Sequence, residues 1–113
     1  MTNKVIPTPF FERKFKRLSK KFSSLAREIE TLEDILLENP ETGISLGANI
    51  YKIRLANKDK SKGKSGGFRV VTYLVYKTEN STDIYLITLF DKSEESSIDK
   101  SVLVRLVRQI FSE

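Results

Sequence analysis

Basic residues lie within or at the ends of strand-like segments in the second half of the chain. Lys52 and Arg54 are two residues apart, Arg69 opens a β-branched and aromatic run, and Lys92 closes another. Convergent Lys and Arg side chains bind phosphate and stabilise the extra negative charge that develops on it in a transition state. These four cations are therefore candidates for a site that acts on phosphate.

Cleavage of RNA suits such a set of cations. RNA carries its own nucleophile, the 2′-hydroxyl, so its cleavage needs neither a metal nor a side-chain nucleophile. The chain has no histidine and no cysteine, which excludes the commonest general acid–base group, a thiolate zinc site and a cysteine nucleophile. Catalysis must then use Lys, Arg, Tyr or carboxylates, and a lysine among other cations can serve as a base. We expect no cofactor and no metal.

A glycine- and lysine-rich segment, "KDKSKGKSGG" (58–67), precedes Arg69. Its alternating lysines predict an electrostatic arm for nucleic acid, because each phosphate contact adds salt-sensitive affinity. A hairpin loop kept in solution by its charges is the alternative. The candidate RNA-binding residues are Lys58, Lys60, Lys62 and Lys64, with Tyr73 further along the strand. "GKS" (63–65) is no phosphate-binding P-loop, because position 58 lacks the required glycine and a strand follows.

Charge is segregated along a chain whose net charge is +5. Residues 4–27 hold eight bases against one acid, residues 28–41 hold six acids and no base, and residues 52–69 hold seven bases against one acid. This pattern predicts an anion-facing region, with ordinary solvated faces as the alternative.

Apolar residues in the first third of the chain follow a helical period. Their spacing alternates between four and three residues, and the stripe consists of Phe11, Phe15, Leu18, Phe22, Leu25, Ile29, Leu32 and Leu36. One long helix would need a coiled-coil partner to cover this stripe. We favour a hairpin of two helices that bends within "SKKFSS" (19–24), with Ser23 or Ser24 capping the second helix.

The remaining chain predicts a sheet followed by a helix. Segments 49–56, 68–76 and 83–90 alternate with a period of two, "KTENST" (77–82) is a hairpin loop between the last two, and "NKVIP" (3–7) is a short edge strand. The tail from Asp99 or Ser97 onward is a helix with Val102, Leu106 and Ile110 on its apolar face, and Leu103, Val107 and Phe111 beside them. The fold class is α+β: an N-terminal helical hairpin on a small antiparallel sheet, with a C-terminal helix, in a single domain (1–113).

Strand alternation assigns the cations to one face of this sheet. Tyr51, Ile53 and Leu55 should face the helices, which leaves Lys52 and Arg54 on the open face. If Arg69 shares that face, cations from three neighbouring strands converge on one hollow. The alternative is a set of unrelated solvent-facing bases. The chain shows neither a membrane-spanning run nor a signal peptide, so we expect a cytoplasmic protein.

Four segments together resemble the RelE/ParE/HigB superfamily of toxins from type II toxin–antitoxin modules, and its RelE-type and HigB-like branches most of all. The segments are "TPFFERKFKRLSKKF", "NPETG", "LGANIYKIRLANKDKSKGKSGGFRVVTYLVY" and "IYLITLFDKSEE". The resemblance implies a RelE-like fold and a ribosome-dependent endoribonuclease that cuts messenger RNA and halts translation. It also implies a cognate antitoxin that masks the basic face, with operator DNA bound only through the antitoxin complex.

The resemblance assigns roles to single residues. Lys52 and Arg54 match the paired bases of the second strand, Arg69 the arginine at the scissile phosphate, and Lys92 the base that closes the last strand. RelE-type enzymes also use a tyrosine shortly after that strand, and residues 93–103 contain none. Two alternatives follow, a ParE-like inhibitor of DNA gyrase and a non-catalytic RNA- or ribosome-binding module. The four cations favour cleavage.

Overall fold

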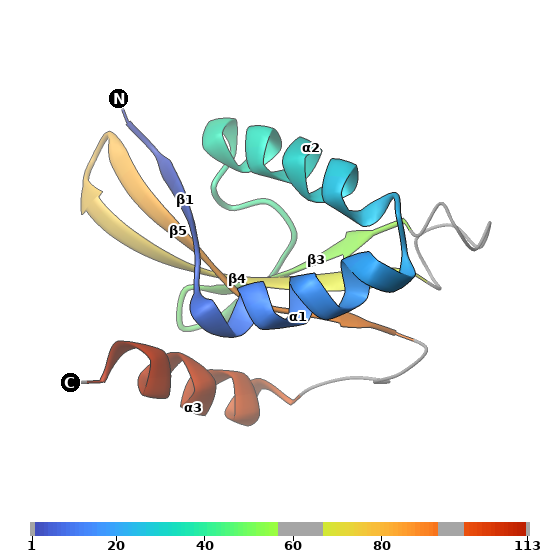
Figure 1. Cartoon of the computed structure of the whole chain (residues 1–113). Helices are drawn as coiled ribbons and strands as arrows, with labels where there is room; N and C mark the ends of the chain where they lie inside the picture. Colours follow the sequence, from blue (N-terminus) through green and yellow to red (C-terminus); the bar gives the residue numbers. More distant parts are fainter. Residues whose placement is uncertain (1, 57–66, 93–98, 113) are drawn as a thin grey trace.

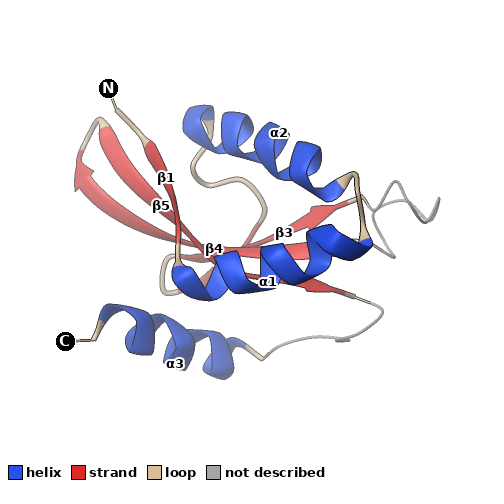
Figure 2. Cartoon of the chain, viewed as in Figure 1, coloured by secondary structure: helices blue, strands red, loops and turns tan. Residues whose placement is uncertain are grey.

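One five-stranded sheet forms the centre of the protein (Figure 2). The structure is a computed structural model, and it describes residues 2–56, 67–92 and 99–112. The strands are β1 (Lys4–Pro7), β2 (Ile44–Gly47), β3 (Ile50–Leu55), β4 (Phe68–Thr78) and β5 (Ser81–Asp91), in the spatial order β1-β5-β4-β3-β2. The α+β class is confirmed. The strand β2 was not predicted, because its four residues, "ISLG", are too few to show a clear alternation.

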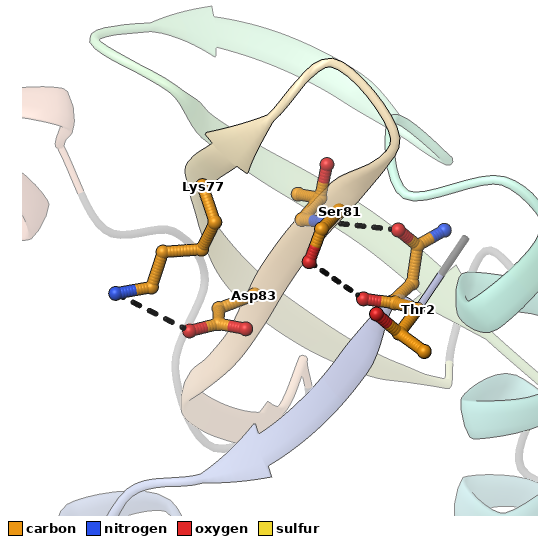
Figure 3. A network of polar contacts seen from close by, with 6 residues as sticks. Thr2, Lys77, Ser81 and Asp83 are labelled. Carbon is orange, nitrogen blue, oxygen red and sulfur yellow. Dashed lines mark hydrogen bonds and ion pairs between the residues drawn. The ribbon is translucent and has the colours of Figure 1, made fainter.

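The antiparallel pairing of β4 with β5 is confirmed. Both strands run further than predicted, so only Glu79 and Asn80 separate them. The short edge strand β1 is also confirmed, although it pairs with β5 in parallel. Figure 3 shows how this edge is held: the Ser81 hydroxyl of β5 donates to the carbonyl oxygen of Thr2 at 2.8 Å. In the same view, Lys77 of β4 lies 3.9 Å from Asp83 of β5.

The helical hairpin is confirmed as two helices, α1 (Pro9–Lys21) and α2 (Leu25–Glu38). Thr8 caps α1 by accepting a hydrogen bond from the amide of Phe11, and its hydroxyl donates to the carbonyl of Leu86 at 2.8 Å. This hydroxyl therefore joins the start of α1 to β5. Ser24 is the N-cap residue of α2 by position, but its side chain makes no capping hydrogen bond.

The sheet has a hydrophobic core on each face (Figure 1). The larger core lies under α1 and α2 and contains almost the whole predicted stripe, from Phe11 to Leu36, packed on Ile53, Leu55 and Phe68. The smaller core lies under α3 (Lys100–Phe111), where Leu103 and Val107 are buried against the opposite face. No helix among the described residues is long and apolar enough to span a membrane.

The apolar face predicted for the last helix is only partly right. Leu103 and Val107 are buried, whereas Val102 is 42% exposed and Phe111 is 39% exposed. Leu106 and Ile110, in the row of Val102, are only partly buried against the same core. Asp99 is the N-cap residue, without a capping hydrogen bond from its side chain.

Two matched leucine substitutions test this layering. Leu18 of α1 is fully buried, and Leu37 of α2 is 41% exposed. Leu18→Ala should lower the free energy of unfolding by about 2–5 kcal/mol, because it leaves a cavity in the core. Leu37→Ala should change it by less than about 1 kcal/mol. Urea unfolding measures both, and equal losses would contradict the assigned core.

Candidate phosphate-binding site

Two arginines face each other across the β3–β4 ladder. Arg54 is the direct antiparallel partner of Arg69, and Lys52, two residues along β3, is the partner of Val71. Cross-strand partners in an antiparallel pair share a face, with Cβ atoms roughly 4.5–5.5 Å apart. The structure therefore brings Lys52, Arg54 and Arg69 together on the face opposite α1 and α2. Alternation predicted this face for Lys52 and Arg54 and left the face of Arg69 open.

These three cations differ in their access to solvent. Arg54 is exposed, Lys52 is half-buried, and Arg69 is only 4% exposed. The guanidinium of Arg69 donates a hydrogen bond from Nη1 to the carbonyl oxygen of Phe68 at 3.2 Å. Burial lowers the pKa of Arg69 below its usual value, and the nearby charge of Arg54 lowers this pKa further. An arginine still stays protonated at neutral pH, so the sheet holds two like charges side by side.

Phe90 supplies the apolar wall that buries Arg69. It is the partner of Arg69 on β5, is 2% exposed, and belongs to the core under α3. Arg69 therefore has an aromatic residue on one side along the row and a second arginine on the other. The sequence reasoning missed Phe90, although its place in "ITLFD", one residue before the end of a strand, could have shown it.

Lys92 lies at the end of β5, beside the start of β4. Its amide donates to the carbonyl oxygen of Gly67 at 3.1 Å, and its side chain is exposed. Gly67 is two residues from Arg69, so Lys92 lies one row beyond the arginine pair. Its membership of the site stays a prediction, because β5 ends at Asp91 and the ladder no longer fixes the direction of its side chain. Lys58, Lys60, Lys62 and Lys64 lie outside the described residues.

Tyr73 shares the face of Arg69 but lies four residues along β4, about 13 Å away at 3.3 Å per residue. Its ring packs on Phe111 of α3, with centroids 5.4 Å apart, and Tyr85 meets the same phenylalanine at 4.6 Å. The prediction of an open face is wrong here, because α3 covers this half of it. That half carries aromatic and aliphatic side chains, and the cations stand at the other end. A common hollow lined by these cations stays a prediction.

Comparison with solved structures identifies the fold. E. coli toxin RelE, as a double arginine-to-alanine mutant in the free state, superimposes with a TM-score of 0.58 over 98% of this chain and 100% of that chain, with 18% sequence identity. The chain has the fold of the RelE toxin. No protein-family model and no curated protein matches the chain. The RelE-like fold predicted from the resemblance is therefore confirmed, and it comprises the helical hairpin, the sheet and the C-terminal helix.

The arginine pair of this RelE-like sheet should cost stability. Like charges directly opposite in an antiparallel pair are unfavourable. Arg54→Gln should therefore raise the free energy of unfolding by about 0.5 kcal/mol in low salt, and the gain should shrink in high salt as the repulsion is screened. Lys16→Gln, on the exposed surface of α1, is the matched control and should give no such gain. A loss of stability in Arg54→Gln at low salt would contradict the repulsion.

Proposed function

We propose that the chain is the toxin of a type II toxin–antitoxin system, a ribosome-dependent endoribonuclease that cleaves messenger RNA. The observation that carries the proposal is the buried Arg69 beside Arg54, on the fold of E. coli toxin RelE. Two arginines on neighbouring strands of one face can bind the same anion. A phosphodiester supplies that anion, and guanidinium groups bind phosphate oxygens through paired hydrogen bonds.

The proposed chemistry is a transfer within the RNA. The 2′-hydroxyl attacks the adjacent phosphorus, the P–O bond to the 5′-oxygen of the next nucleotide breaks, and a 2′,3′-cyclic phosphate is left. The proton of the hydroxyl is removed as the P–O bond forms, and the departing 5′-oxygen gains a proton. Arg69, with Arg54 beside it, binds the phosphate that gains negative charge at this step, which such donors stabilise most effectively in a site that excludes water.

Lys52 and Lys92 extend this positive region on either side of the arginine pair. Lys52 stands on the same face as the pair, and Lys92 lies at the end of the sheet beside Gly67. In the proposal, both neutralise flanking phosphates and help to orient the scissile one. On the basis of the sequence, the proposed RNA contacts also include the lysines of residues 58–64 and Tyr73. The proposal assigns no general acid or base.

The proposal implies two macromolecular partners. One is messenger RNA on the ribosome, and the other is a cognate antitoxin that covers the cations and through which the complex reaches operator DNA. The proposed setting is the cytoplasm. No group of three carboxylates in the described part of the chain is arranged to hold a metal ion, and the proposed reaction uses none.

Primer extension on translated messenger RNA tests the proposal. The wild-type protein should give cuts in phase with the codons, and Arg69→Ala should reduce their rate by at least about 100-fold, the usual cost of removing one group that stabilises a transition-state charge. Lys16→Ala removes a charge from α1 outside the site and should leave the rate within a few-fold. Circular dichroism checks that both variants fold.

Other results would assign another function. DNA breaks with intact messenger RNA would indicate a ParE-like gyrase inhibitor. Ribosome binding without cleavage would indicate a non-catalytic module. Cleavage that survives Arg69→Ala would remove this arginine from the proposed site.

A further inference from the structure

A groove runs between α1 and α3, away from the arginine pair. Two cavities of about 380 and 430 Å³ adjoin there and share Phe10, Leu106 and Gln109 as lining residues. Thr88 of β5 forms part of the floor, and Ile110 lies at the other end. Figure 1 shows α1 and α3 next to each other beside β5. Each cavity has room for several aliphatic side chains.

One wall of the groove is an apolar ridge on α3. Val102, Leu106 and Ile110 follow one another at four-residue spacing, so they form a row along the helix. All three line the groove, and Val102 is 42% exposed. The neighbouring row of α3, with Leu103 and Val107, is the one that packs on the sheet. A ridge of this spacing is the surface that a second helix packs against.

The other wall combines an aromatic ring with positive charge. The guanidinium of Arg13 lies 5.5 Å from the ring centroid of Phe10, and the ammonium of Lys14 lies 5.9 Å from it. Arg105 of α3 also lines the groove. Among the described residues that line one cavity or the other, three are basic and none is acidic. The groove therefore combines the apolar ridge with positively charged side chains.

We propose that this groove binds an amphipathic α-helix of a partner protein, with an apolar stripe flanked by Asp and Glu. The apolar stripe would pack on the α3 ridge and Phe10, and the acidic residues would lie beside Arg13, Lys14 and Arg105. Nucleic acid would leave the aliphatic ridge uncovered, since Val102, Leu106 and Ile110 offer neither a flat ring for base stacking nor a hydrogen-bond donor. The inference stands on the groove and does not require nuclease activity.

The groove lies next to the layer that buries Arg69. Leu103 lines its inner end and belongs to the same core cluster as Phe90 and Val71. Phe90 is the ladder partner of Arg69, and Val71 is the ladder partner of Lys52. A helix bound in the groove would therefore contact the element that covers one half of the cationic face.

A synthetic helical peptide of about 16 residues tests the proposal, since shorter helices are marginal in water. It carries leucine at every third and fourth position and glutamate elsewhere, and fluorescence anisotropy follows its binding to the full chain. Arg13→Glu with Arg105→Glu should weaken binding at least tenfold. Lys16→Glu with Lys20→Glu makes the same charge change on the exposed surface of α1, outside the groove, and should weaken it less than threefold.

A second pair of variants tests the apolar ridge. Val102→Ser alters the ridge at a position 42% exposed, and Leu37→Ser alters α2 at a position 41% exposed. Only Val102→Ser should weaken binding, and circular dichroism verifies that every variant folds. The proposal is overturned if the peptide does not bind, if both charge variants lose affinity equally, or if a peptide of the same charge without the leucine stripe binds as well. Displacement of the peptide by a single-stranded RNA in proportion to its charge would also overturn it. Primer extension on the same variants is a separate measurement, so either proposal can fail alone.

Discussion

The cationic face of the sheet depends on two like charges that strand pairing holds side by side. The antiparallel register of β3 and β4 fixes Arg54 opposite Arg69, and Phe90 in the same row removes Arg69 from water. The register itself is set by the residues buried on the opposite face, which are Ile53, Leu55, Phe68 and Val70. The two arginines therefore stay cross-strand partners as long as β3 and β4 remain paired. In the proposed function, one phosphate binds to both guanidinium groups and offsets the repulsion between them.

The rest of the fold serves this face in different ways. The helical hairpin covers much of one side of the sheet and packs on the larger core, which holds the strand register. The helix α3 covers only part of the other side, through Leu103 and Val107, and leaves the end of the sheet that carries the cations. The acidic run of residues 28–41 lies largely on α2 and the following turn, on the side of the sheet away from Arg69. The basic run of residues 4–27 lies largely on α1, on the same side of the sheet as this acidic run, so the sheet separates only the cations of β3 and β4 from the acidic residues.

Much of this was predictable, and the failures have physical causes. The helical stripe and the period-two strands are strong local signals, so the hairpin, β3, β4 and β5, and the shared face of Lys52 and Arg54 followed from spacing. The face of Arg69 did not, because it depends on the register between β3 and β4. The depth of burial of Arg69 did not, because it depends on Phe90 from another strand and on where α3 packs. The exposure of Val102 was not predictable either, since two adjacent apolar rows on a helix look alike until packing on the sheet decides between them. The strand β2 was not predicted because four residues beside a turn are too few to show a period of two.

Nuclear magnetic resonance of the arginine side chains tests the central claim most directly. The probe is a short RNA with a single 2′-deoxy nucleotide at the position of the attacking hydroxyl, which binds and cannot be cut. Its addition should shift the side-chain Nε–H signals of Arg69 and Arg54 together, with one saturation curve, because one phosphate lies against both. Unchanged signals from both arginines, while basic side chains elsewhere on the protein respond to the RNA, would contradict this claim.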